Sequence, residues 1–126
     1  MTKYKSQGFI NTFRNARKGM RLSLKSEQNI RVHILCGAFA LALGFALHFS
    51  TVKFCILLLT IVMVISSEMM NSAIEFALDS IYHNKYSRMV GMAKDIAAGA
   101  VMIVTVVALM IGVLLFIPPI YRIIIS

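Results

Sequence analysis

Charged residues are scarce in this chain of 126 residues: they make up 14% of it, whereas 59% of the residues are hydrophobic. A soluble domain usually has about a quarter of its residues charged. The stretch 96–121 contains no charged residue at all. This shortage excludes an ordinary soluble domain, and the long uncharged runs indicate a small polytopic membrane protein of the all-α class.

Other shortages narrow the function. The two cysteines, Cys36 and Cys55, lie inside apolar runs, a placement that predicts neither a disulfide framework nor a metal site. No P-loop and no glycine-rich phosphate motif occurs, which argues against a soluble-type kinase fold. No cleavable signal peptide is evident, since the first apolar run starts too late for one. Because the sequence shows no internal repeat and no sign of a second domain, we interpret 1–126 as a single membrane domain.

The basic residues are concentrated at one end. The net charge is +8, and eight of the thirteen lysines and arginines lie in the first 31 residues. Residues 9–25 place apolar and basic side chains on different faces, which predicts an amphipathic helix on an anionic membrane surface. A basic flank that only sets topology is the alternative. We expect a membrane partner and no nucleic acid.

Three membrane spans are predicted at about 30–49, 54–76 and 95–117. We expect a break at 50–53, a second helix that continues to Tyr82, a loop at 83–92, and an end to the third helix at Pro118 and Pro119. The distribution of lysine and arginine predicts that the N-terminus lies inside and the C-terminus outside the cytoplasmic membrane.

Four of the five acids lie in the stretch that joins the second and third spans, and four polar residues there are spaced by 3, 4 and 4: Glu68, Asn71, Glu75 and Asp79. On a helix they cover an arc of about 80°. At 1.5 Å per residue, Glu68 lies about 8 Å below the predicted exit of the helix from the membrane, and Glu75 about 10 Å higher. We call these four residues the polar stripe.

The stripe suits phosphoryl transfer at the membrane surface. Glu68, at the depth of a lipid hydroxyl, is a candidate general base. Glu75 is a candidate ligand of a hard divalent cation, and Lys94 supplies a positive charge for phosphate. Structural pairing of helices and an ion pathway stay open as alternatives. Small residues in AKDIAAGA favour close helix packing, and three spans alone are too few to enclose a nucleotide and a lipid, which favours a homo-oligomer with shared sites.

The motif ExxNSAIExxxD followed by AKDIAAGAV resembles the small integral-membrane prokaryotic diacylglycerol kinase family, which includes the undecaprenol kinases. KGMRLSLKSEQNIRVHI is similar to the entry of that family's first span. The resemblance implies a homotrimeric helical bundle of three-span subunits, with an N-terminal surface helix and composite sites at the cytoplasmic interface. It implies ATP and Mg²⁺ as cofactors and a lipid alcohol as substrate.

The resemblance also assigns roles to residues. Glu68 would be the catalytic base, and Glu27 and Glu75 would hold the magnesium. The expected nucleotide contacts are Asn15, Glu27, Asn71, Glu75, Tyr86, Ser87, Lys94 and Asp95. The expected lipid contacts are Arg21, Arg31, His33, Glu68 and Ala98.

Some positions depart from the family pattern. Asn15 stands where members often have a tyrosine, and Ser87 where many have a histidine. His33 stands where the diacylglycerol-specific branch tends to have an acid, so IRVHI is more similar to the Gram-positive branch. We therefore expect an ATP- and magnesium-dependent kinase of a membrane lipid alcohol that favours undecaprenol over diacylglycerol. The alternatives are a diacylglycerol kinase and, more remotely, a non-enzymatic transporter or assembly subunit.

Overall fold

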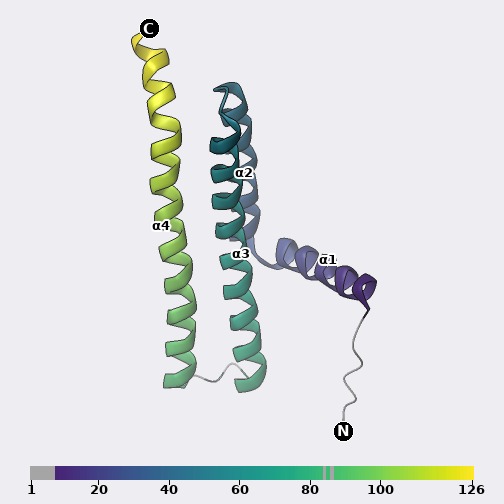
Figure 1. The fold of residues 1–126 in the computed structure, drawn as a ribbon. Coiled ribbons are helices and arrows are strands. Elements are labelled where there is room, and N and C mark those ends of the chain that lie inside the picture. The colour runs from purple at the N-terminus through teal and green to yellow at the C-terminus, as the bar shows by residue number, and fades with distance from the viewer. Residues whose placement is uncertain (1–7, 84, 86) are drawn as a thin grey trace.

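The computed structural model describes residues 8–83, 85 and 87–126, and these form four helices and no strand. The helices are α1 (Phe9–Ser26), α2 (Gln28–Ala46), α3 (Thr51–Tyr82) and α4 (Arg88–Ile125). In Figure 1, α2, α3 and α4 run side by side, whereas α1 projects sideways from the start of α2. The prediction of an all-α membrane protein is confirmed, since α2, α3 and α4 are each long and apolar enough to cross a membrane.

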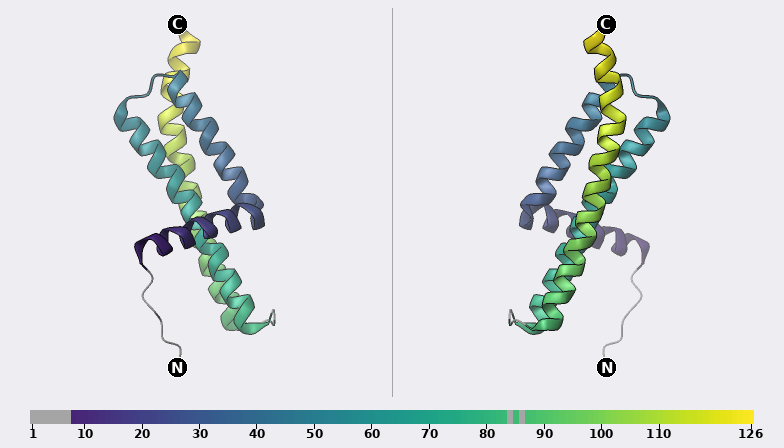
Figure 2. Two further views of the ribbon diagram at one scale, coloured as in Figure 1. Left: turned by 90° about the vertical axis from the view of Figure 1, so that its right-hand side faces the viewer. Right: turned by 90° about the vertical axis from the view of Figure 1, so that its left-hand side faces the viewer.

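The lower parts of α3 and α4 extend well past the level of α1, as Figure 2 shows from two sides. These two helices are packed against each other along their length, and α2 covers only the upper part of α3. The end of α3 and the start of α4 therefore lie far from the turn between α2 and α3. Glu68, at the upper end of the polar stripe, still lies beside α2, and the stripe continues down the extended part of α3 to Asp79.

Hydrogen bonds to backbone carbonyl oxygens of α1 hold the elbow between α1 and α2. The backbone N–H of Glu27 donates to the carbonyl oxygen of Ser23, and the Arg31 guanidinium donates to the carbonyls of Leu24 and Lys25 at 2.8 and 3.0 Å. These carbonyls belong to the last turn of α1, where a helix leaves four acceptors without partners. Arg31 thus fixes the end of α1 to the first turn of α2.

The turn between α2 and α3 comes earlier than the predicted break at 50–53. His48 has a positive φ of 56°, and α2 has already ended at Ala46. The Ser50 hydroxyl oxygen accepts a hydrogen bond from the backbone N–H of Lys53 at 3.3 Å. Because Ser50 is the N-cap, the residues expected in the break form the first turn of α3. The membrane borders of the spans remain predictions.

The expectation that α4 ends at Pro118 and Pro119 is wrong, because both prolines lie inside the helix, which continues to Ile125. Each proline removes one N–H donor from the helix. An apolar segment in a membrane has no water to hydrogen-bond an unwound backbone, so continuing the helix leaves fewer groups without partners. The start of α4 is also earlier than the predicted loop 83–92 allows, since the helix begins at Arg88.

A small cluster of aromatic and aliphatic side chains joins the turn between α2 and α3 to α4. Phe49 lies 5.0 Å from Phe116 between ring centroids and packs with Leu57 and Leu115. Most large apolar side chains of the three long helices are exposed instead. Such surfaces suit contact with lipid chains or with further helices.

Close approach of α2 to α3 depends on glycine. A Cβ atom built on Gly37 would lie 2.8 Å from Cγ2 of Ile61, a branch methyl that cannot rotate away without moving the whole side chain. A Cβ on Gly44 would lie 3.0 Å from the Phe49 ring. The two glycines mark the line along which the helices touch.

We predict that Gly37→Ala destabilises the fold by about 1–2 kcal/mol, since overpacking outweighs the gain in helix propensity. Gly19→Ala is the matched control on α1, where no atom lies within 4 Å of the new Cβ, and it should be neutral or stabilising by up to about 1 kcal/mol. The measurement is unfolding in mixed micelles followed by circular dichroism. In an Ile61→Ala background the penalty of Gly37→Ala should disappear; a penalty that persists there would show that the contact is not its cause.

Candidate functional site

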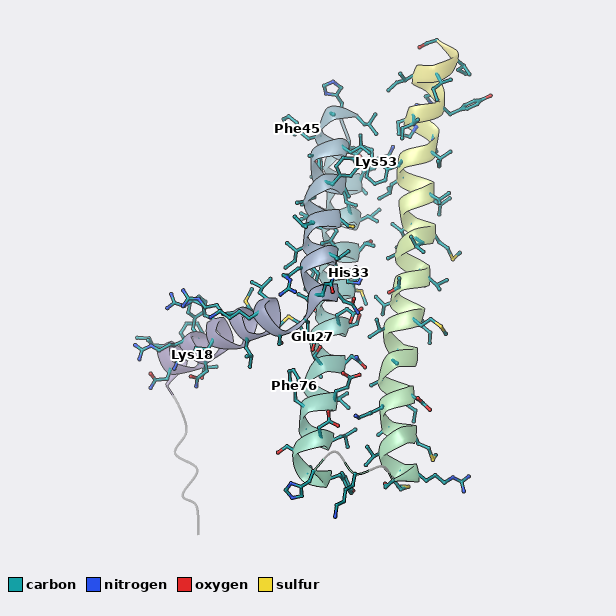
Figure 3. The ribbon with its side chains drawn as sticks, turned by 180° about the vertical axis from the view of Figure 1, so that it is seen from behind. Lys18, Glu27, His33, Phe45, Lys53 and Phe76 are labelled. Carbon is teal, nitrogen blue, oxygen red and sulfur yellow. The ribbon has the colours of Figure 1, made fainter. Side chains whose placement is uncertain are left out.

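The polar stripe lies at the contact between helices and not on the open surface. Glu68, Asn71, Glu75 and Asp79 are all half-buried on α3, and the neighbouring Ser72 is buried. Figure 3 shows that Phe76 on the same helix points away from α4. The spacing in the sequence therefore predicts one side of α3 that turns toward the other helices.

At the upper end of the stripe, α2 and α3 bring a histidine and a carboxylate together. Nε2 of His33 lies 3.3 Å from Oε1 of Glu68, and their side chains are 27% and 12% exposed. When the Nε2 atom carries the proton, it donates to the carboxylate and holds one of its two oxygens.

An apolar cavity of about 370 Å³ lies along α2, α3 and α4, and His33 lines it. Small side chains make room for it on two helices: Cys36, Gly37 and Ala40 on α2, and Ala108 and Gly112 on α4. Two threonines of the spans, Thr60 on α3 and Thr105 on α4, also line this cavity. Because His33 is bonded to Glu68, this end of the cavity lies close to the carboxylate.

In the middle of the stripe, one buried acceptor has no partner. Nδ2 of Asn71 donates to Oε1 of Glu75 at 3.4 Å. Oδ1 of Asn71 is buried and, among the residues that the structure describes, accepts no hydrogen bond. A buried oxygen without a partner is unfavourable unless a ligand satisfies it. An amide oxygen beside a carboxylate is a donor set that suits a hard divalent cation.

At the lower end, α3 and α4 form a polar pocket of about 220 Å³, which we call the loop-end pocket; it is lined by Leu78, Asp79, Tyr82, Lys85, Val90, Gly91, Lys94 and Asp95. Nζ of Lys94 lies 2.6 Å from Oδ1 of Asp79, and the two side chains are 35% and 38% exposed. Sequence reasoning assigned no role to Asp79. Its signal was present, however, because Asp79 completes the 3, 4, 4 spacing of the stripe.

Two of the predicted site residues make hydrogen bonds that stabilise helix ends. Ser87 is the N-cap of α4, and its hydroxyl oxygen accepts a hydrogen bond from the backbone N–H of Val90 at 3.2 Å. Arg31, expected to contact lipid, fixes the elbow between α1 and α2. Tyr86 lies outside the described residues.

The remaining predicted residues are not gathered into one cluster. Glu27 lies half-buried at the elbow, where Figure 3 shows it below His33. Asn15 and Arg21 are exposed on α1, and Ala98 is exposed on α4. Within residues 8–83, 85 and 87–126, no group of three or more acids, histidines or cysteines could hold a metal.

The chain is similar to known proteins over most of its length. A family model described as prokaryotic diacylglycerol kinase matches residues 14–116. A protein named diacylglycerol kinase from Synechocystis sp. is 31% identical over 108 residues, which cover 86% of this chain and 62% of that relative. A protein named undecaprenol kinase from Bacillus subtilis is 34% identical over 110 residues, which cover 87% of this chain and 89% of the relative.

The chain thus spans about three fifths of the length of the Synechocystis relative and nearly all of the Bacillus one. The matched residues 14–116 include most of α1, all of α2 and α3, and α4 as far as Phe116. They contain the polar stripe, the His33 and Glu68 pair, and the loop-end pocket. The chain therefore belongs to the prokaryotic diacylglycerol kinase family.

Proposed function

We propose that this protein is a lipid kinase that transfers a phosphoryl group from magnesium-bound ATP to the hydroxyl of a membrane lipid alcohol, with undecaprenol favoured over diacylglycerol. Membership of the family supports the reaction class. The observation that carries the proposal is the carboxylate of Glu68, 12% exposed and bonded to His33 at the edge of an apolar cavity.

Glu68 acts as the general base. The lipid chain lies along the apolar cavity with its hydroxyl at the carboxylate, whose second oxygen accepts the hydroxyl proton. The lipid oxygen then forms a bond to the γ-phosphorus as the bond to the ADP oxygen breaks. Burial of Glu68 between helices keeps water from competing with the lipid as the acceptor.

The residues of the stripe fit a magnesium-nucleotide. The unpartnered Asn71 oxygen and the adjoining Glu75 carboxylate offer two oxygen ligands, and Glu27 at the elbow would supply a second carboxylate. Bound magnesium would neutralise charge on the phosphates during transfer. Lys94 and Asp95, in the loop-end pocket, contact the phosphate chain on the side away from the lipid. Asn15 and Arg21, exposed on α1, are proposed as contacts for nucleotide and lipid.

The preference for undecaprenol rests on His33 and on the relatives. The Bacillus relative named undecaprenol kinase is matched over 89% of its length, against 62% for the one named diacylglycerol kinase. Diacylglycerol is the alternative substrate and would give phosphatidic acid. A transporter or assembly subunit is less favoured, because the spans carry few polar groups along their depth.

The assembly belongs to the same proposal. We propose a homotrimer in the cytoplasmic membrane with the N-terminus and the active site inside and with sites shared between subunits. The scattered positions of Glu27, Asn15 and Ala98 favour completion of the site by a second copy. The exposed apolar side chains of α2, α3 and α4 leave room for such neighbours.

The test of the function is a competition assay with labelled ATP and with undecaprenol and diacylglycerol in one mixed micelle. Wild type should label undecaprenol faster. Glu68→Gln should lower the rate on both lipids by about 10²–10⁴-fold, since it loses a positioned base but keeps the shape of the side chain. Near-normal turnover by this variant would remove Glu68 from the mechanism, and no labelling by the folded wild type would overturn the function.

Glu75→Gln should act on the metal and not on the lipid. The amide is a weaker ligand than the carboxylate, so we expect the magnesium concentration for half-maximal rate to rise about tenfold or more, with the KM for lipid unchanged. Activity is measured against magnesium at fixed lipid, and against lipid at saturating magnesium. Glu27→Gln should behave alike. A change confined to the lipid KM would show that the metal assignment is wrong.

His33→Glu should shift the ratio of kcat/KM for undecaprenol to kcat/KM for diacylglycerol toward diacylglycerol. A carboxylate there can accept a hydrogen bond from the second polar group of a glycerolipid, which a polyprenol lacks. Because it also faces Glu68, like-charge repulsion should slow both reactions, so the ratio is the informative quantity. His33→Gln is the control that keeps a donor for Glu68. An unchanged ratio in a variant that still turns over would place the determinant elsewhere.

A further inference from the structure

Asp79 and Lys94 form the shortest of the side-chain contacts between helices that the structure describes, at 2.6 Å from Oδ1 to Nζ. Asp79 stands one helical turn beyond Glu75 on the same face of α3, and Lys94 comes from the second turn of α4. The carboxylate therefore holds the ammonium group about one turn from the proposed magnesium ligand. In the absence of phosphate, the positive charge of Lys94 is already matched.

The loop-end pocket as a whole is electrically balanced. Its lining includes two acids, Asp79 and Asp95, and two lysines, Lys85 and Lys94, with Tyr82 as the remaining polar group on its wall. A site with unpaired lysines would attract any polyanion, because a field of one sign concentrates counter-ions. A balanced site attracts a strongly charged ligand much less.

We propose that Asp79 is a positioning residue that makes the nucleotide site selective for ATP in complex with a divalent cation over metal-free ATP. This inference rests on the proposed function, since it assumes that Lys94 receives nucleotide phosphate. Metal-free ATP carries two more negative charges than its complex with a divalent cation. Asp79 withholds the Lys94 ammonium from those two charges, whereas in the complex the cation already neutralises them.

The selectivity has a use in the proposed reaction. Metal-free ATP bound at Lys94 would occupy the site without the cation needed for transfer. A carboxylate fixed beside the phosphate-binding lysine removes that unproductive complex. The pair is about one third exposed, so solvent screens it, and the effect on affinity should be moderate, about 3–10-fold.

The experiment measures dissociation constants of a non-hydrolysable ATP analogue for the full-length protein in micelles, once with excess Mg²⁺ and once with EDTA. For Asp79→Asn we expect metal-free affinity to rise about 3–10-fold and Mg²⁺-complex affinity to change by less than about twofold. An unchanged ratio of the two constants would overturn the proposal. So would a ratio that falls only because the Mg²⁺ complex binds more weakly, since Asp79 would then be a metal ligand.

A double-mutant cycle tests whether Asp79 acts through Lys94. In a Lys94→Gln background, Asp79→Asn should leave the ratio unchanged, because the ammonium that it controls is gone. If Asp79→Asn still changed the ratio in full in that background, the carboxylate would act by direct repulsion of phosphate. That result would contradict a positioning role. Asp79→Glu keeps the charge and should retain most of the selectivity. Circular dichroism and micelle size confirm that each variant folds, which separates the role from a structural tie between α3 and α4.

Failure of this inference and failure of the proposed function give different results. If the ratio shifts as expected but no lipid is phosphorylated by wild type, Asp79 still governs nucleotide selectivity and the lipid-kinase assignment falls. If wild type phosphorylates lipid and Asp79→Asn keeps the wild-type ratio, the function stands and Asp79 has no part in selectivity. A wild-type protein that binds no nucleotide overturns both.

Discussion

The structure depends on the rule that a backbone in lipid must satisfy its own hydrogen bonds, which makes long unbroken helices the economical form for this chain. With 32 residues, α3 is about 48 Å long at 1.5 Å per residue, whereas the hydrocarbon core needs about 30 Å. The surplus is long enough to carry rigid helix beyond a membrane. Asp79, near the end of α3, lies on this surplus, whereas Glu68 lies beside α2.

The same rule explains both what could be predicted from the sequence and one error. The presence of the helices and the single polar face of α3 follow from the periodicity and composition of the sequence. The N-cap residues Ser50 and Ser87 shift the helix boundaries only slightly from those predicted. The expected stop at Pro118 and Pro119 fails because it takes its rule from helices in water. There an unwound backbone finds new partners, whereas beside lipid it does not.

The pairs that define the candidate site were beyond sequence reasoning for a different reason. His33 with Glu68 and Asp79 with Lys94 join different helices, and their contact depends on how far each helix is rotated and shifted against its neighbour. Periodicity fixes which face a residue occupies, but not its partner on another helix. Glu68, Glu75 and Lys94 could therefore be proposed individually as site residues. The pairing of Asp79 with Lys94 and the capping by Ser87 became visible only in the three-dimensional structure.

Gly37 takes part both in the packing of α2 against α3 and in the lining of the apolar cavity. The absent side chain lets Ile61 approach, and this brings α2 close enough for His33 to reach Glu68. The same small residue lines the apolar cavity that begins at His33. A larger residue would both separate the helices and fill the cavity. The contact between the helices and the size of the cavity are therefore set by one position, so a substitution at Gly37 changes the proposed lipid site and the packing of α2 together.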